Sequence, residues 1–245
     1  MSDDPLRARA TDPRQYDRPE LDWTRQGAPD SASSRAYQVA LREALAGVRV
    51  TAAVDIGCGL GPLEPLLREL GAQRVVGIEP SAQSAAIARR SHPAMEVIES
   101  PLETVTLDGG FDLAVAVMSF EHQPDLAAAF RNVSRLLVSG GRFALITGDP
   151  DFHRTPHLGL SVDARYLPDG SIAVATSYPF GTIHDLVRSP EQIVTAATGA
   201  GFVVERRIPL MPTPLLIEDD PGWREIADRP YGHLFVLRSA TSRST

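Results

Sequence analysis

Between residues 50 and 147 the sequence alternates between short, continuously apolar runs and segments with helical periodicity. The apolar runs, each expected to form a strand, are residues 50–56, 74–78, 95–98, 111–118 and 142–147. A strand that is apolar at almost every position is buried on both faces, which is typical of a parallel sheet with helices on both sides. The alternation therefore predicts a doubly wound α/β domain.

The segments between and beyond these runs carry residues that begin and end helices. Apolar residues three or four positions apart predict helices within 31–47, 63–70, 81–90, 126–137 and 189–202. Ser189 is expected to cap the last of these, with Pro190 at its first position and Gln192 completing a capping box. Gly71 and the Gly140-Gly141 pair are expected to end two others.

Residues 150–188 interrupt the alternation of strands and helices. The stretch "SVDARYLPDGSIAVATSY" alternates with period two on both sides of a Pro-Asp-Gly turn, which predicts a β-hairpin. This segment is interpreted as a cap inserted into the core. Two late strands, at 202–208 and 233–238, are joined by a proline-rich loop with apolar residues 215–217. Residues 31–245 are therefore expected to form a single domain.

Residues 1–30 contain four prolines among many charged residues. This composition predicts a flexible arm without regular secondary structure. Tyr16 and Trp23 are large aromatic residues within it. They favour either a lid that folds over a site or simple packing on the domain surface, and the sequence leaves both interpretations open.

The composition excludes some classes of partner. The formal net charge of −7 and the lack of basic clusters argue against nucleic-acid binding. Cys58 is the single cysteine, so an intrachain disulfide is impossible, which fits a reducing compartment. Neither a signal peptide nor an apolar run of about 20 residues is present, so we expect a cytoplasmic protein without a membrane partner. The sequence does not determine the oligomeric state.

A glycine-rich turn, "VDIGCGLG", follows the first predicted strand at residues 54–61. In an open parallel sheet, ligands bind outside the carboxyl ends of the strands, where this turn lies. A dinucleotide fingerprint needs a third glycine where this chain has Pro62, and Asp55 would repel two phosphates. The turn therefore favours a positively charged nucleoside without phosphate, although a tight turn with no ligand is the alternative. Glu79 ends the second strand, at about the 20-residue spacing typical of a ribose-binding acid.

With these motifs in this order, the sequence resembles the class I S-adenosylmethionine-dependent methyltransferases over about residues 35–148. "VDIGCGLG" is similar to the first motif of that family, and "VVGIEPS" is similar to its second-strand acid. "FDLAVAVMSFEHQPD" and "FRNVSRLLVSGGRFALIT" resemble the fourth strand and the segment ending in the fifth. The resemblance implies a Rossmann-like seven-stranded sheet of order 3-2-1-4-5-7-6, with the last strand antiparallel, and a methyltransferase domain at 31–245.

The resemblance also implies which residues bind S-adenosylmethionine. Glu79 would contact the ribose, and Pro80 the adenine. The residues implied for the methionine part are Asp55, Gly57, Cys58 and Gly59, and Met118 would line the pocket. The family often has an acid after the third strand that binds the adenine amino group. This chain has Ser100-Pro101 there, with Glu99 and Glu103 nearby, so the adenine contact is not fixed by the resemblance.

Methyl transfer requires mainly positioning, and a base is needed when the acceptor is a hydroxyl that must lose its proton. His122, after the fourth strand, and His153, after the fifth, are the candidate catalytic residues, with Glu121 beside His122 and His157 beside His153. Packing or capping roles are the alternatives for each. The ligand spacing does not favour a metal. The expected pocket is lined by aromatic residues from the arm and the cap: Tyr16, Trp23, Phe152, Tyr166, Tyr178 and Phe180.

The sequence thus predicts a methyltransferase that acts on a small molecule, with O-methylation of a metabolite or natural-product intermediate as the leading hypothesis. N- or C-methylation is the close alternative. A nicotinamide-dependent oxidoreductase and a cofactor-binding protein without methyl transfer are two further classes that remain open.

Overall fold

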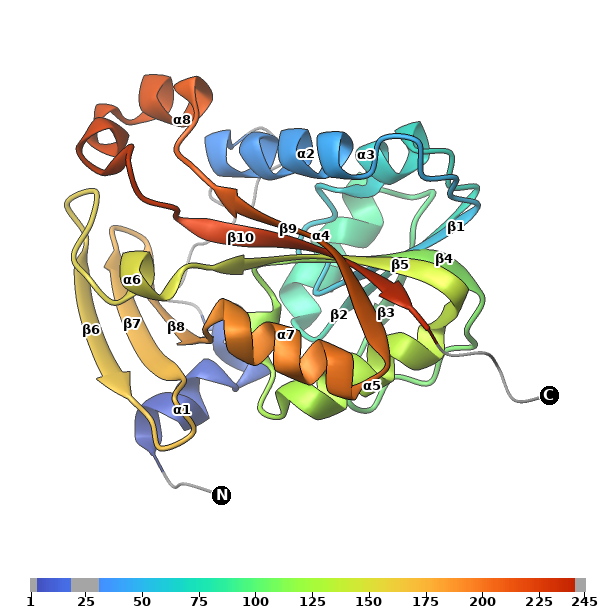
Figure 1. Cartoon of the computed structure of the whole chain (residues 1–245), viewed down its shortest axis with the longest axis horizontal. Helices are drawn as coiled ribbons and strands as arrows, with labels where there is room; N and C mark the ends of the chain where they lie inside the picture. The colour runs from blue at the N-terminus through green and yellow to red at the C-terminus, as the bar shows by residue number, and fades with distance from the viewer. Residues whose placement is uncertain (1–3, 19–30, 241–245) are drawn as a thin grey trace.

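The computed structural model of the 245-residue chain describes residues 4–18 and 31–240. Its centre is a seven-stranded sheet with the order β3-β2-β1-β4-β5-β10-β9, in which β10 is antiparallel to both neighbours (Figure 1). The strands are β1 (Ala52–Ile56), β2 (Arg74–Glu79), β3 (Glu96–Glu99), β4 (Phe111–Val117), β5 (Leu137–Gly148), β9 (Phe202–Leu210) and β10 (Gly232–Ser239). Counted without the cap strands, this is the predicted order 3-2-1-4-5-7-6, with the antiparallel last strand confirmed.

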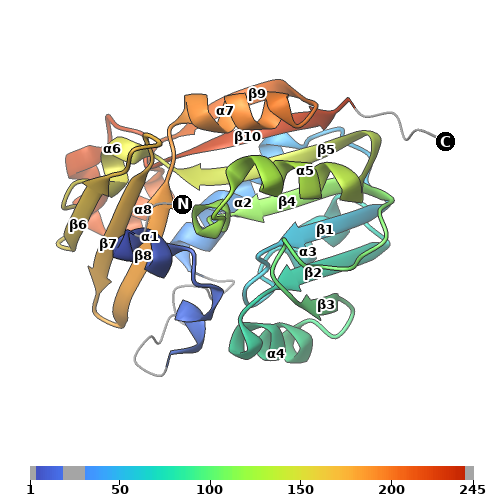
Figure 2. The same ribbon diagram turned by 90° about the horizontal axis from the view of Figure 1, so that it is seen from below.

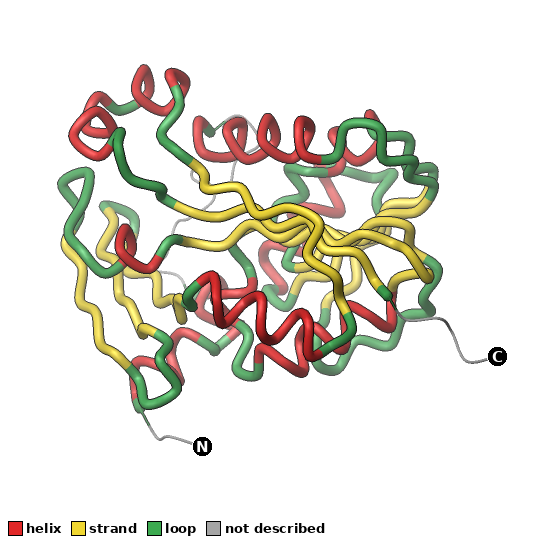
Figure 3. Tube along the Cα trace, in the orientation of Figure 1, coloured by secondary structure: helices red, strands yellow, loops and turns green. Residues whose placement is uncertain are grey.

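Helices cover both faces of the sheet, as the continuously apolar strands predicted. The core helices are α2 (Ala32–Ala44), α3 (Glu64–Glu69), α4 (Ala82–Ser91), α5 (Leu126–Leu136) and α7 (Pro190–Gly199). Leu41 and Leu66 pack α2 and α3 on one face, and Phe130 and Ile193 pack α5 and α7 on the other (Figure 3). The predicted capping box of α7 is present. Each face therefore buries its own apolar cluster, which fixes the positions of the strand ends.

The Gly140-Gly141 pair does not end a helix as predicted. Helix α5 ends at Leu136, and β5 begins at the next residue, so both glycines lie within the strand. The pairing of β4 with β5 is irregular at this point. A Cβ on Gly141 would lie 3.0–3.3 Å from three backbone carbonyl oxygens, so the glycine is required by the close approach of two strands.

The cap is larger than the predicted hairpin. Strands β6 (Ser161–Tyr166) and β7 (Ile172–Tyr178) form the hairpin, and β8 (Gly181–Val187) adds a third antiparallel strand. The short helix α6 (Pro150–His153) connects the core to this sheet. The cap sheet stands at the carboxyl ends of β4 and β5 (Figure 1). Sequence reasoning missed β8 because it carries His184 and Asp185, two polar residues that the fold buries.

The N-terminal arm forms two short helices, α1 (Pro5–Ala10) and the 3-10 helix η1 (Pro13–Asp17). The expectation of no regular element was wrong for these residues. The physical reason is that each proline occupies the first helical position, where its missing N–H has no cost, and the side chain of Asp4 or Asp12 caps the helix. Trp23 lies outside the described residues.

Two further short helices, α8 (Pro214–Asp219) and η4 (Pro221–Ile226), lie in the connection between β9 and β10, beside α2 (Figure 1). The apolar residues 215–217 fall within α8. Throughout the described part of the chain, every helix is too short or too polar to cross a membrane.

Candidate active site

The glycine turn after β1 packs directly against the loop that follows β4. The amides of Gly57 and Cys58 donate to the carbonyl of Ile78 at 2.8 and 3.1 Å. Gly57 has a φ of +69°, and a Cβ there would lie 2.4 Å from the Cβ of Ser119. The Ser119 hydroxyl in turn donates to the Ile56 carbonyl at 2.7 Å. Position 57 must therefore be glycine, for both its backbone conformation and its lack of a side chain.

Glu79 joins this turn to the start of α4. Its two carboxylate oxygens accept hydrogen bonds from the Gly59 and Ser81 amides, each at 2.8 Å. Burial nevertheless raises the pKa of Glu79 to about 7. The Glu79 carboxylate thus ties the glycine turn to the start of α4, and its predicted role toward the ribose stays a prediction.

Asp55 is 1% exposed, and within residues 4–18 and 31–240 its Oδ2 has no hydrogen-bond partner. Burial, together with the charge of Glu79, raises the pKa of Asp55 to about 8. Two buried carboxylates thus lie at one turn, and no cationic side chain of the described ranges is paired to either. Such a site fits a ligand that brings positive charge and hydroxyl donors of its own.

The other predicted cofactor residues lie around the same strand ends. Ser100 donates its amide to the Glu79 carbonyl at 3.1 Å, but its hydroxyl contacts the Pro101 carbonyl within its own turn. Glu99, the neighbouring acid, pairs with Arg89 at 3.3 Å. The remaining predicted residues are Cys58, which is buried against Gly77, half-buried Pro80, and Met118, which has a φ of +51° at the end of β4. Their roles toward the cofactor stay predictions.

His122 ends the 3-10 helix η3 (Phe120–His122) and lies in a hydrogen-bonded network with the arm. Its Nδ1 is 3.0 Å from the Ala10 carbonyl oxygen, and its Nε2 is 2.8 Å from the Tyr16 hydroxyl. The carbonyl can only accept, so Nδ1 carries the proton and the neutral ring accepts from Tyr16 at Nε2. Burial lowers the pKa of His122, which keeps the ring neutral.

Two buried acids flank His122. Glu121 is 2% exposed, and its Oε1 accepts from the Gly148 amide at 2.8 Å. Asp185 of β8 is 8% exposed, and its Oδ1 lies 3.8 Å from His122 Nε2. Burial raises the pKa of both acids, to about 7 for Asp185. The buried guanidinium of Arg188 donates to the carbonyls of Phe120 and Gln123, so it holds the η3 loop in place.

Three consecutive arm residues contact three different elements. Gln15 exchanges two hydrogen bonds with the backbone of His184 in β8, at 3.1 and 3.2 Å. Tyr16 contacts His122, and Asp17 accepts from the Ser81 hydroxyl at 2.7 Å and the Gln83 amide at 3.1 Å, at the start of α4. The arm lies between the cap sheet and α4 (Figure 2). It therefore borders both the glycine turn and His122.

His153 lies in a second cluster, at the end of β5. Its ring packs over Gly148 and edge-on against Phe152, and burial lowers its pKa to about 4. In the same region His233 Nε2 is 2.8 Å from Asp149 Oδ2. The structure thus brings His122, not His153, into contact with the arm. A catalytic role for His153 stays a prediction.

The expected aromatic lining is present only in part. Phe152 stacks on Trp223, with ring centroids 5.6 Å apart, and Tyr178 stacks on Phe180 at 4.9 Å. Tyr166 was wrongly included, because its side chain is on the outward edge strand of the cap and is 66% exposed. Sequence reasoning did not find Trp223, because its position in the connection before β10 gave no sign that it returns to this edge.

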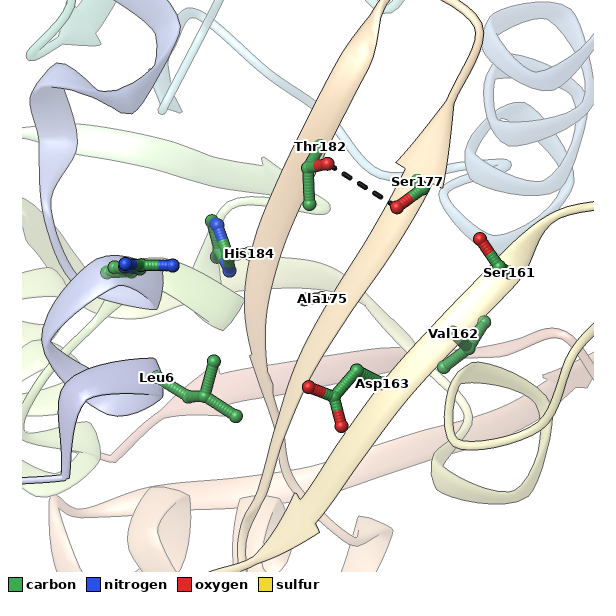
Figure 4. A pocket seen from close by; sticks show the side chains of 9 residues that line it. Leu6, Ser161, Val162, Asp163, Ala175, Ser177, Thr182 and His184 are labelled. Atoms are coloured by element: carbon green, nitrogen blue, oxygen red, sulfur yellow. Dashed lines mark hydrogen bonds between the residues drawn. The ribbon is translucent and has the colours of Figure 1, made fainter.

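An open groove of about 440 Å³ lies elsewhere, on the outer face of the cap sheet beside α1 (Figure 4). It is lined by Leu6, Arg9, Asp163 and His184, among others, and by no residue of the glycine turn or the η3 loop. The buried acids and the Tyr16–His122 pair instead gather at the carboxyl edge of the main sheet, where we place the candidate site. In the described ranges no group of three His, Cys, Asp or Glu side chains is arranged to hold a metal ion.

The strand order, the glycine turn and the strand-end Glu79 together define the class I S-adenosylmethionine-dependent methyltransferase fold. Residues 54–145 match the model of the methyltransferase domain family. The chain therefore contains a methyltransferase domain over residues 54–145 and has the class I fold, and S-adenosylmethionine is the cofactor of that class.

Known proteins agree with this family. The chain is 31% identical over 189 residues to an uncharacterized 37.1 kDa transposon protein of Streptomyces fradiae, covering 73% of this chain and 51% of that protein. It is 29% identical over 203 residues to a ubiquinone biosynthesis O-methyltransferase of Rhodopseudomonas palustris, covering 80% and 73%. A crystal structure of an S-adenosylmethionine-dependent methyltransferase from Mesorhizobium loti superposes with a TM-score of 0.65 at 25% identity, covering 85% of this chain and 100% of that one. The chain thus spans between half and three quarters of these two curated relatives.

Proposed function

We propose that this protein transfers the methyl group of S-adenosylmethionine to a hydroxyl group of a small molecule, a metabolite or a natural-product intermediate. The observation that carries the proposal is the neutral His122 held by Tyr16 next to the glycine turn. The name of the Rhodopseudomonas relative, an O-methyltransferase, supports a hydroxyl acceptor. We also propose that the protein works in the cytoplasm.

The cofactor site is proposed to consist of the glycine turn and the ends of β2, β3 and β4. Asp55 would face the positively charged half of the cofactor. Glu79 would accept hydrogen bonds from the ribose hydroxyls, and to do so it must give up a hydrogen bond that it now accepts from a backbone amide, such as that of Gly59. The remaining contacts are proposed for Gly57, Cys58, Gly59, Pro80, Ser100, Pro101 and Met118. The unpartnered Asp55 oxygen is the feature that best fits a cationic ligand.

When bound, S-adenosylmethionine supplies a methyl group on a sulfonium, whose C–S bond breaks as the new C–O bond forms. The chain must then accept the hydroxyl proton. Tyr16 is positioned to pass its own proton to His122 Nε2 while it receives the proton of the acceptor. The Ala10 carbonyl stabilises the resulting imidazolium through Nδ1–H.

N-methylation is the second candidate, and the observation that favours it is the buried pair Glu121 and Asp185. An amine acceptor is cationic at neutral pH, so these acids are suited to bind it, and one of the carboxylates would take the proton that the nitrogen must lose before it attacks the methyl group.

The cofactor is tested by calorimetric titration of S-adenosylhomocysteine into the wild type and a Glu79→Ala variant, with NAD as the control. We expect binding that weakens about tenfold or more in the variant, since a charge-assisted hydrogen bond to ribose is lost. Absence of binding to a folded wild type would overturn the proposal.

The proton path is tested with Tyr16→Phe and His122→Gln once an acceptor is known. With a hydroxyl acceptor, we expect each to lower kcat by about a hundredfold, with the loss partly recovered at high pH, where the acceptor ionises without help. The control is Arg14→Ala, an exposed residue of the same η1 turn. A kcat that stays at the wild-type value in both variants would show that transfer needs no base.

A further inference from the structure

We propose that the acceptor carries a protonated amino group, which binds between Glu121 and Asp185 beneath the inner face of the cap sheet. This inference rests on the proposed methyl transfer and concerns the substrate class at the same site. If the methylated atom is a hydroxyl oxygen, the ammonium group only anchors the molecule; if it is the amine nitrogen, the ammonium must first pass a proton to one of the two carboxylates, which frees the lone pair that attacks the methyl group.

The two faces of the cap sheet have different environments. His184 lies on the outer face, toward α1 (Figure 4). Successive side chains of a strand point to opposite faces, so Asp185 lies on the inner face, where it shares a register position with Val174. Thr176 follows on that face, is fully buried, and its hydroxyl has no hydrogen-bond partner among the described residues. The inner face therefore holds an acid and a free hydroxyl in a site that excludes solvent.

Glu121 provides a second unmatched group. Its Oε1 accepts from the Gly148 amide, but Oε2 is fully buried and without a partner in the described ranges. A buried carboxylate oxygen that neither water nor a donor reaches is strongly unfavourable. Oε2 is thus the second independent feature that calls for a donor.

Residues 4–18 and 31–240 place no cationic side chain in an ion pair with Glu121 or with Asp185, since the ring of His122 is neutral. Arg188 is the buried cation beside Glu121, but its donors contact the carbonyls of Phe120, Leu186 and Gln123. In the described part of the chain, the ion pair nearest to either acid is the 3.8 Å contact between Asp185 and His122, whose ring is neutral. An ammonium group bound between the two acids would favour their ionised forms, which burial disfavours in its absence.

Aromatic rings surround the same acids. The negative charges of Asp185 and Glu121 act on the buried hydroxyls of Tyr16 and Tyr37 and, after burial, help to raise their pKa. Tyr178, on the same face as Thr176, also has its pKa raised by burial and by Asp185. The hydroxyls of these tyrosines lie close enough to the acids to feel their charge, and each is a further acceptor for the N–H groups of an alkylammonium ion. A metal ion fits less well, because no three ligating side chains converge in the described residues.

The test uses the full chain saturated with S-adenosylhomocysteine and two matched pairs of probes. Tyramine is compared with tyrosol, and glucosamine with glucose, so that each pair differs only in an ammonium group against a hydroxyl. Calorimetry is expected to show at least one amine binding about tenfold or more tightly than its alcohol. Equal affinity within both pairs, or no binding of either amine, would overturn the inference.

Variants then locate the amine. Asp185→Asn and Glu121→Gln keep the shape of each side chain and remove its charge, so each is expected to reduce the preference for the amine about fivefold or more. Asp163→Asn is the matched control, since Asp163 lies on the outer face of the same sheet and lines the open groove. A preference that survives both inner substitutions, or that Asp163→Asn removes, would place the amine elsewhere and contradict the proposal.

Affinity for S-adenosylhomocysteine separates the possible failures. A wild type that binds it but does not discriminate amines from alcohols contradicts only this inference, whereas a wild type that does not bind it contradicts the proposed function. If either charge-removing variant does not fold, Thr176→Val replaces it in the test. This substitution removes the buried hydroxyl at nearly constant shape, and it is expected to weaken the binding of tyramine more than the binding of tyrosol.

Discussion

At the scale of single residues, the candidate site is built from buried acids with no guanidinium paired to them in the described part of the chain. Asp55, Glu79, Glu121 and Asp185 are each at most 8% exposed, and burial is the largest cause of the raised pKa in all four. A ligand-free protein with such groups gives up stability, which is typical of a site arranged for a charged ligand rather than for folding.

Asp55 gives a test of this cost. Its pKa is about 8 in the folded protein and about 3.8 when unfolded, so between these values the folded state retains a proton that the unfolded state has lost. The raised pKa of Asp55 therefore makes the free energy of unfolding depend on pH. Its contribution to that free energy is fully present below pH 4 and is lost as the pH rises toward 8. We expect the difference in Tm between pH 5 and pH 8 to be smaller in Asp55→Asn than in wild type, by roughly 5 °C.

Thermal unfolding of both proteins at several pH values, without cofactor, measures this difference. The exposed Glu103→Gln substitution is the control for a general change of net charge. If the Tm of wild type and Asp55→Asn changed in parallel from pH 5 to pH 8, Asp55 would already be ionised in the folded protein.

Single residues were predictable where their role depends on nearby sequence. Gly57 and Glu79 follow from a strand, a turn and a spacing of about 20 residues, all of which are local. Asp185 and Gln15 were not found, because their contacts join positions more than 60 residues apart in the chain. Nothing in the sequence near Asp185 distinguishes it from a solvated acid on an exposed strand.

At the scale of elements, the arm is the part that most changes the interpretation of the site. Predicted from its prolines as irregular, it forms α1 and η1 because those prolines start helices. The helices of the core were predicted well, since capping and periodicity are local. Strand β8 and the continuation of β5 through Gly140-Gly141 were not predicted. Both depend on pairing with a neighbouring strand, which the local sequence does not show.

The arm gives an element-scale prediction. In a Gln15→Ala, Asp17→Ala double variant, the hydrogen bonds to β8 and α4 are lost, so Tyr16 is no longer held against His122. We expect kcat to fall about tenfold at a temperature where the variant stays folded, while Tm decreases by about 10 °C, since four hydrogen bonds of roughly 1 kcal/mol each are lost and the two of Gln15 are buried.

Steady-state kinetics and thermal unfolding of the same preparation check this expectation, with Arg14→Ala as the control in the same turn. A loss of activity that only follows the fraction of unfolded protein, with kcat per folded molecule unchanged, would instead mean that the arm acts only by stabilising the fold.

At the scale of the whole molecule, the cap sheet and the arm together enclose the carboxyl edge of an acidic α/β domain. Three segments far apart in the sequence, the arm, the η3 loop and β8, meet around His122. The core sheet fixes the position of the glycine turn, and the cap sheet and the arm bury the acids. Because charges interact more strongly away from water, the core, the cap and the arm together produce a site with a strong preference for positive charge.

This preference predicts that binding of S-adenosylmethionine releases protons. At pH 6.5 Asp55 and Glu79, with pKa values of about 8 and 7, are mostly protonated in the free protein, and a sulfonium favours their ionised forms. Affinity should therefore rise as the pH increases from 6 to 9, and should do so more for S-adenosylmethionine than for the uncharged sulfur of S-adenosylhomocysteine. Calorimetry at pH 6.5 in two buffers of different ionisation enthalpy measures the protons released, and Asp55→Asn should release fewer. Proton uptake, or equal release for both ligands, would show that these acids do not face the sulfonium.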